Sequence, residues 1–289
     1  MHAFRKIVFV LLIAGFILAC AITSTPTVAP NQPGVATIVA STMQSYTAVP
    51  NPNDVVYNNI SLIIPPGIAT NALTGTVPAI TDEQQYGPWA LAPEHVKILF
   101  DNYSPFTGFL NAELLVYPAR DFSSISDMAK ENIRKLQAIA DKTAQPTSEN
   151  MPAIPFFNAG QVIAAQIQAV SFKNGTGVRL VTQYDNGIVP ISNNELFYHF
   201  QGLTSDGKYY IIAVLPTSAD FLPADDTKYT IDSPTALDFP LFYKANPTGD
   251  DFKAYFQAVT DKLNTTPEEN YKPSLRTLDA LIQSITITP

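Results

Sequence analysis

Apolar residues along this chain recur with two periods, one typical of strands and one typical of helices. Four stretches in the middle of the chain are rich in branched and aromatic side chains, which favours strands. Asn174-Gly175 separates the first two stretches and Ser205-Asp206-Gly207 the last two, and both sequences suit turns between antiparallel strands. The pattern predicts a four-stranded meander, with strands at residues 161–173, 176–184, 195–203 and 208–215.

Three further strand-like segments precede the meander. They are a hairpin over residues 55–64 and two strands over residues 94–103 and 109–117. Asn58-Asn59 tolerates the positive φ angles of the hairpin turn. Residues 67–93 and 216–248 show no periodicity, and we expect both to be long irregular segments.

Helical periodicity occurs at three places. Ser124 and Asp127 form a capping-box pattern before an apolar stripe, and Thr248 and Asp251 form a second one. Pro273 suits the first turn of a third helix. The stripes consist of Ile125, Ala129, Ile133, Leu136 and Ala140; Phe252, Tyr255, Phe256, Val259 and Leu263; and Leu275, Leu278, Leu281, Ile282 and Ile285. Together these patterns predict an α+β fold, an antiparallel sheet with helices on its faces.

The first twenty residues have the pattern of an export signal. Arg5 and Lys6 precede an uninterrupted run of apolar or small residues at 7–19, and Cys20 follows as the only cysteine of the 289-residue chain. The run suits the core of a secretory signal, because a membrane-spanning helix needs roughly 20 apolar residues.

The junction Ile17-Leu18-Ala19-Cys20 resembles the lipobox of bacterial lipoproteins, although Leu18 stands where Ala or Ser is commoner. The resemblance implies that Cys20 is lipidated and becomes the new N-terminus, with the membrane as its partner through that lipid. The protein would then lie on the extracytoplasmic face of the cell membrane or beyond it. An ordinary secretory signal and an uncleaved anchor are the alternatives.

Residues 21–53 contain no Asp, Glu, Lys or Arg and are rich in Thr, Pro, Ser and Ala. This composition buries too little apolar surface to fold, so we expect a tether. The predicted organisation is a signal peptide at 1–19, a lipidated cysteine and tether at 20–53, and one globular domain at 54–289.

The charge balance limits the partners. Removing residues 1–19 leaves 15 basic and 25 acidic residues, a net charge of −10. An acidic protein with few Lys and Arg is a poor candidate for binding nucleic acid or anionic lipid through a basic surface. A chain with 46% hydrophobic residues is long enough to build a core without disulfides.

Two local motifs are similar to the PsbP/Mog1-like fold of extracytoplasmic lipoproteins. Residues 57–67 (YNNISLIIPPG) resemble the opening hairpin of that family, and residues 278–285 (LDALIQSI) resemble its closing helix. The aromatic residue that the family places soon after the opening proline is absent. The resemblance implies a fold but leaves the function open, because the family binds diverse partners.

Few residues suggest chemistry. His95 and His199 lie far apart in sequence, the acidic pairs lack calcium-loop spacing, and no cysteine remains for a metal. No Gly-x-Ser-x-Gly motif or phosphate-binding glycine loop occurs. We therefore expect no metal, no cofactor and no catalytic residues.

One group of polar residues is a candidate ligand patch. Arg179 and Gln183 share a face of one predicted strand, and His199 and Gln201 share a face of another. If the two faces coincide on the open side of the sheet, the four side chains would bind a small polar ligand. The alternative is a face covered by a helix, with every hydrogen bond satisfied.

The sequence leads to three hypotheses about function. The first is a non-catalytic lipoprotein that serves as a binding or assembly module of the cell envelope, with an envelope protein as its partner. The second is a lipoprotein that binds a solute or small ligand, and the third is an envelope enzyme.

Overall fold

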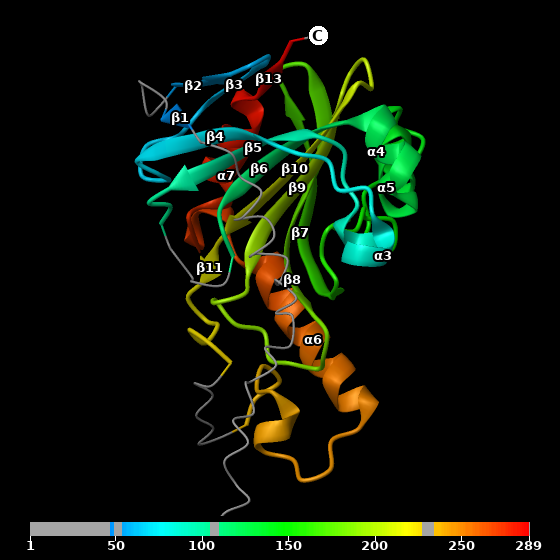
Figure 1. Ribbon diagram of the computed structural model, residues 1–289. Helices are drawn as coiled ribbons and strands as arrows, with labels where there is room; N and C mark the ends of the chain where they lie inside the picture. The colour runs from blue at the N-terminus through cyan, green and yellow to red at the C-terminus, as the bar shows by residue number, and fades with distance from the viewer. Residues whose placement is uncertain (1–46, 49–53, 105–109, 227–233, 289) are drawn as a thin grey trace, which may run out of the picture. The chain divides into compact units, whose positions relative to one another are not determined.

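The computed structural model describes residues 47–48, 54–104, 110–226 and 234–288. The signal peptide, Cys20 and nearly all of the tether lie outside the described residues. Eight strands form one antiparallel sheet (Figure 1). Their order across the sheet is β1 (Thr47–Ala48), β4 (Asn71–Val77), β5 (His95–Asp101), β6 (Glu113–Pro118), β10 (Tyr209–Pro216), β9 (Phe197–Thr204), β8 (Gly175–Asp185) and β7 (Gly160–Phe172). The predicted α+β class is confirmed.

The sheet consists of two meanders that join at their centre. Strands β4 to β6 form one and strands β7 to β10 form the other, as predicted for residues 161–215. Strand β10 pairs with β9 on one side and with β6 on the other, with Ile211 opposite Val116. The last strand of the second meander, β10, therefore pairs with the last strand of the first, β6.

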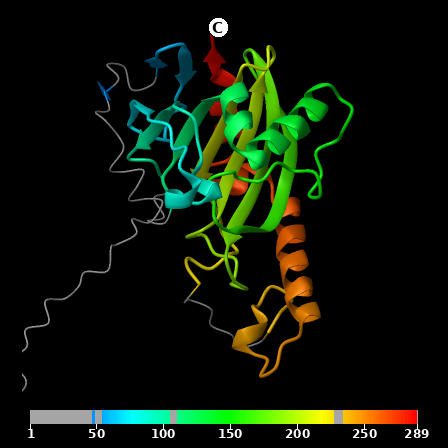
Figure 2. The ribbon, with the colours of Figure 1, turned by 45° about the vertical axis from the view of Figure 1, so that its right-hand side comes forward.

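Two helices cover one face of the sheet, and Figure 2 shows them in green. They are α4 (Ala119–Ile125) and α5 (Asp127–Ala140). Buried residues of α5, among them Ala129 and Leu136, pack with Leu180 and Ile212 of the sheet. Ala129, Ile133 and Leu136 of the predicted stripe pack on the sheet, and so does Ile139, which the stripe did not include.

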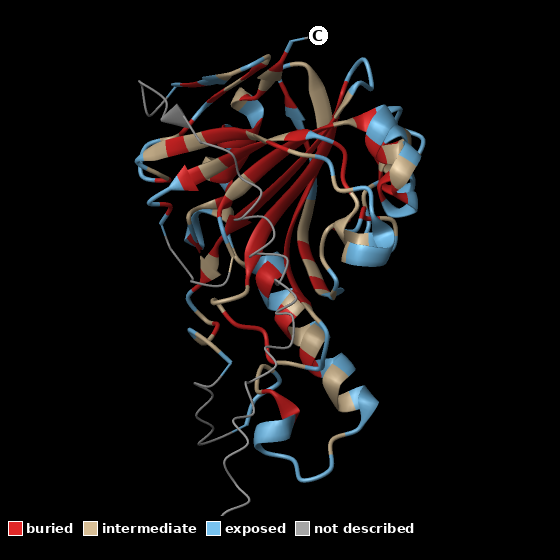
Figure 3. Cartoon of the chain, viewed as in Figure 1, coloured by how far each residue is buried: buried red, intermediate tan, exposed pale blue. Residues whose placement is uncertain are grey.

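The opposite face is covered by helices α6 (Gly249–Thr265) and α7 (Leu275–Ser284) together with a small sheet. That sheet consists of β2 (Asp54–Tyr57), β3 (Ile60–Ile63) and β13 (Thr286–Ile287). Figure 3 shows the central strands largely buried, because side chains on both of their faces pack against these layers. This arrangement buries any polar side chain on the inner strands.

Several local predictions are confirmed. Asn58 turns the β2–β3 hairpin with φ 52°. Thr248 and Asp251 form a reciprocal capping box at the start of α6. Leu275 and Ile285 are buried with the rest of the third stripe, although Ser274 caps α7 and Pro273 precedes it.

Other predictions are wrong in detail. Residues 67–93, expected to be a loop, contain β4, α3 (Glu83–Tyr86) and the 3₁₀ helix η1 (Pro88–Ala90). Strand β4 (NALTGTV) contains a glycine and lacks a period-two alternation of apolar and polar residues, and it forms by pairing with β5. The predicted helix start at Ser124 is wrong, because Ser124 lies inside α4. Ser126 caps α5 instead, by accepting a hydrogen bond from the Ala129 amide.

The remaining elements are short. They are β11 (Ser218–Ala219), η2 (Pro240–Phe242), η3 (Glu268–Asn270) and β12 (Tyr271–Lys272). Strand β11 and η2 are the regular structure within the described part of 216–248, which was expected to be irregular. Thr47 and Ala48, assigned to the tether, pair with Thr74 and Leu73 of β4 and thus extend the sheet.

Candidate functional site

The four residues of the predicted ligand patch do not share a face of the sheet. Arg179 lies opposite Phe200 in the β8–β9 register, and Leu180 lies opposite His199. Because paired residues of an antiparallel sheet point to the same side, Arg179 and Gln183 face α6 and α7, whereas His199 and Gln201 face α5. All four side chains are fully buried. The expected coincidence of the two faces does not occur.

His199 and Gln201 belong to a network of hydrogen bonds beneath α5. The Gln201 amide nitrogen donates to His199 Nε2 at 2.7 Å and to the carbonyls of Pro152 and Ala153. Since His199 Nε2 accepts, its Nδ1 carries the proton and donates to the Ala213 carbonyl at 3.0 Å. Burial lowers the pKa of His199 to about 3, so the imidazole is neutral.

Helix α5 contributes Asn132 to the same network. Its amide donates to the Ala153 carbonyl at 2.6 Å and to the Tyr210 hydroxyl at 3.2 Å, and its carbonyl accepts from the Ala153 amide. Tyr210 in turn donates to Gln201 Oε1. These side chains bind one another and the backbone at 152–153, which indicates a role in packing rather than in recognising a ligand.

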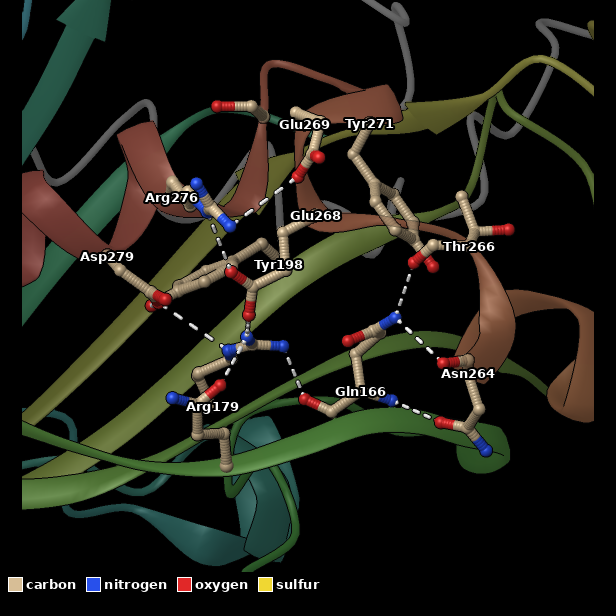
Figure 4. A network of polar contacts seen from close by, with 12 residues as sticks. Gln166, Arg179, Tyr198, Asn264, Thr266, Glu268, Glu269, Tyr271, Arg276 and Asp279 are labelled. Carbon is tan, nitrogen blue, oxygen red and sulfur yellow. Dashed lines mark hydrogen bonds and ion pairs between the residues drawn. The ribbon is translucent and has the colours of Figure 1, made fainter.

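Arg179 is the centre of a second network, on the opposite face (Figure 4). Its guanidinium donates to the Gln166 carbonyl at 2.5 Å, to Gln168 Oε1 at 2.7 Å and to Glu268 at 2.5 Å. Its Nε lies 3.5 Å from Asp279 Oδ1 and has no hydrogen-bond partner among the described residues. The network ties β7 and β8 to η3 and α7.

Asp279 is the most deeply buried carboxylate of this network. Tyr198 donates to its Oδ1 at 2.8 Å. Burial raises the pKa of Asp279, although Arg179 and the Tyr198 hydrogen bond both act to lower it. A carboxyl held by Arg179 and Tyr198 in this way is a structural group.

Gln183 binds a third set of partners. It donates to Glu195 Oε2 at 2.7 Å and to the Pro190 carbonyl at 3.1 Å, and it accepts from the Ser192 amide. Burial, together with the charges of Asp185 and Asp226, raises the pKa of Glu195 to about 7. Gln183 thus anchors the β8–β9 connection to the sheet.

An open groove lies outside these buried networks. It has a volume of about 600 Å³ and is bordered by the α3–η1 segment, the start of α5 and residues 157–159. Trp89, Phe157 and Met128 supply apolar surface to it, while Asn158 and Asn186 supply exposed amides. Small-molecule sites are typically concave, with apolar walls and a few polar groups, and this groove has that composition.

Two other hollows are less promising. One, of about 600 Å³, lies beside Tyr103, Ser104 and Leu110, next to residues outside the described part of the chain. The other, of about 740 Å³, lies between α6 and β7 and is lined by residues such as Val162, Ile167 and Phe256. Neither brings together charged or aromatic groups in a way that indicates a ligand.

The described part of the chain has neither a metal-binding cluster nor a membrane-spanning helix. No group of three His, Cys, Asp or Glu side chains there is placed to hold a metal ion. His95 is buried and stacks on Tyr117 with ring centroids 4.3 Å apart. Within residues 54–104, 110–226 and 234–288, no helix combines the length and the apolar composition needed to cross a bilayer.

Sequence reasoning missed the groove because Trp89 lies in the segment expected to be a loop. The sequence feature that could have indicated the groove is the only tryptophan of the chain, which directly follows Gly87-Pro88. No family model, curated protein or solved structure matches this chain. Its function has to be inferred from the residues themselves.

Proposed function

We propose that this protein is a bacterial lipoprotein, anchored through Cys20 on the extracytoplasmic face of the membrane, whose folded part is a non-catalytic binding or assembly module of the envelope. One observation carries the anchor: the only cysteine of the chain directly follows the apolar run at 7–19, where a lipobox requires it. Two or more acyl chains on that residue are sufficient for stable anchoring, at about 0.8 kcal/mol per buried methylene.

The interior of the folded part supports a binding role over catalysis. His199, Arg179 and Gln183 are buried and bonded to other protein groups, whereas the groove presents the exposed amides of Asn158 and Asn186. Glu83 and Asp127 line the groove, but among the described residues no His, Cys or Lys joins them there as a base or nucleophile.

The anchor is tested by membrane fractionation of cells that express Cys20→Ser. We expect this variant to leave the membrane fraction, whereas Thr25→Ser, a matched control in the predicted tether, stays there. Mass spectrometry of the N-terminal peptide should find acyl chains on Cys20 in the control alone. An unchanged distribution of Cys20→Ser would contradict the lipoprotein proposal.

A second candidate is a lipoprotein that binds a solute or small ligand, and the groove beside Trp89 favours it. A ligand that binds the folded state alone stabilises it by RT ln(1 + L/Kd), where L is the free ligand concentration, so the melting temperature rises with the logarithm of that concentration once it exceeds the dissociation constant. Ligand-dependent thermal stabilisation would support this candidate. Crosslinking to a neighbouring protein on intact cells would instead support an assembly module.

We further propose that the fold is PsbP/Mog1-like. The two motifs that suggest it contact each other, since the Ser284 hydroxyl at the end of α7 accepts from the Ile63 amide at 2.9 Å and donates to the Ile63 carbonyl at 3.2 Å. An experimental structure whose sheet order superimposes on that family would support the proposal, and a different strand order would refute it.

A further inference from the structure

The groove beside Trp89 has a rigid aromatic wall. An added Cβ at Gly87 would lie 2.6–2.9 Å from atoms of the Trp89 indole, so the ring packs closely against the Gly87 backbone. Gly87 has a φ of 83°, which also favours glycine. The indole is therefore held in place by the backbone while remaining partly exposed to the groove.

The lining of the groove includes a second packed ring. Phe157 packs edge to face against Phe156 and Tyr184, with ring centroids 5.1 and 5.4 Å apart. Like Trp89, it lines the groove while partly buried. Because both rings are positioned before any ligand arrives, a planar or flat-faced ligand would lose little free energy in ordering them.

The charges of the groove disfavour ionic ligands. Its lining contains Glu83 and Asp127 but no Lys or Arg, which excludes a site built for phosphate or another anion. Asp127 lies in the first turn of the 14-residue helix α5, where the positive end of the helix offsets its charge. Glu83 is exposed to solvent, which screens its charge and weakens its attraction for a cation.

The polar groups of the groove both donate and accept. Asn158 and Asn186 carry exposed amides. The Ser124 hydroxyl donates to the Asp121 carbonyl at 2.7 Å, which leaves its lone pairs free to accept. A neutral ligand with many hydroxyl groups and an apolar face matches this set.

We propose that the groove binds a neutral saccharide unit, with the C–H face of a sugar ring stacked on Trp89 and its hydroxyls bonded to Asn158, Asn186 and the carboxylates. The electron-rich face of the indole attracts the C–H groups of the ring. This proposal rests on the ligand-binding candidate above and is independent of the lipid anchor.

The only tryptophan of the chain provides the test. The full chain is purified in a polyoxyethylene detergent that contains no sugar. It is then titrated with four tetrasaccharides: chitotetraose, cellotetraose, maltotetraose and xylotetraose. We expect a saturable change in Trp89 emission with at least one of them. Inorganic phosphate, tetramethylammonium and adenosine serve as anionic, cationic and stacking probes and should give none.

Calorimetry on variants locates the binding. Trp89→Ala should weaken saccharide binding by about tenfold or more, whereas Tyr243→Ala, an exposed aromatic outside the groove, should leave it unchanged. Asn158→Ala and Asn186→Ala replace exposed amides and should fold normally, which their melting curves check, yet each should weaken binding severalfold.

The proposal would be overturned by an absence of saturable binding of all four oligosaccharides, or by binding that all three groove variants leave unchanged. Binding of tetramethylammonium, phosphate or adenosine in place of saccharide would overturn it as well. In these cases the lipid anchor still stands or falls by the fractionation of Cys20→Ser, so the two failures are distinguishable.

Discussion

Glu268 and Arg179 form an ion pair with 2.5 Å between the carboxylate and the guanidinium, although 89 residues separate them in the sequence. The Arg179 side chain is completely buried and the Glu268 side chain is 27% exposed. Glu268 also pairs with the exposed Arg276. The pair holds η3, which precedes α7, against the central sheet. We expect its contribution to stability to depend mainly on the burial of Arg179.

Arg179→Met should destabilise the protein strongly. It leaves Glu268 and Asp279 without their buried cation and removes the donors to Gln166 and Gln168. Breaking a buried pair in this way costs about 3–5 kcal/mol. Urea unfolding followed by circular dichroism measures the loss.

Arg276→Met is the matched control, because the Arg276 side chain is 72% exposed and contacts the same Glu268. We expect its effect to stay within about 1 kcal/mol, as for other exposed pairs. Equal losses in the two variants would show that the Arg179 network adds nothing beyond a surface contact.

Ser126→Ala should cost about 1 kcal/mol of stability, the usual effect of losing a helix N-cap. Ser126 accepts from the Ala129 amide, whereas Ser124, two residues earlier, bonds only the Asp121 carbonyl within α4. Ser124→Ala should therefore be nearly neutral. Thermal unfolding of both variants decides between the two positions, and a larger loss at Ser124 would place the cap where the sequence motif suggested.

Periodicity and turn chemistry were sufficient to predict most of the fold. The four strands of the second meander combine branched residues with Asn-Gly or Asp-Gly turns, and the stripes of α6 and α7 have a clear helical period. Strand β4 could not be predicted, since it contains Gly75 and shows no period-two alternation of apolar and polar residues. Its pairing with β5, which the local sequence does not reveal, makes this segment a strand.

The candidate sites were harder to predict, because the face of each strand depends on its register. Period-two alternation correctly grouped Arg179 with Gln183 and His199 with Gln201, but it cannot say whether two strands present those groups to the same side. Leu180, and not Arg179, lies opposite His199 in the β8–β9 register. A shift of one residue in this register would have placed Arg179 and His199 on the same face. The sequence did not predict Trp89 as a site residue for a different reason. The groove that Trp89 lines forms only where α3 and η1 pack beside α5.

Glu195→Gln should change how stability depends on pH. The pKa of Glu195 is raised from its ordinary 4.5 to about 7 by burial and by Asp185 and Asp226. The folded state therefore binds this proton more tightly than the unfolded chain, and the wild type loses stability as pH rises from about 4.5 to 7. Since Glu195 is partly exposed, we expect a loss of about 1 kcal/mol rather than the full value of the shift.

Glutamine at position 195 retains an oxygen that accepts from Gln183 but does not titrate. The variant should match the wild type near pH 4.5 and exceed it at pH 8, in free energies of unfolding measured across that range. Glu149→Gln, at an exposed position, should follow the wild-type curve. A wild-type advantage that grows with pH would contradict the assigned direction.

Asn132 and Tyr210 should be energetically coupled. Asn132→Ala leaves the Ala153 amide without its acceptor, and Tyr210→Phe removes both the acceptor for Asn132 and the donor to Gln201. Each change should cost about 1–3 kcal/mol, because a buried polar group is left unpaired. The double variant should cost less than the two single losses added together, by at least about 0.5 kcal/mol, since both remove the same bond.

Asn132→Ala combined with Thr260→Ala is the control pair. Thr260 lies on α6, on the opposite face of the sheet, and its hydroxyl bonds the Phe256 carbonyl. Without shared partners, the two losses should add to within about 0.5 kcal/mol in urea unfolding. Additive losses for Asn132 and Tyr210 as well would mean that α5 is held to the sheet by apolar packing alone, with its polar network contributing only independent bonds.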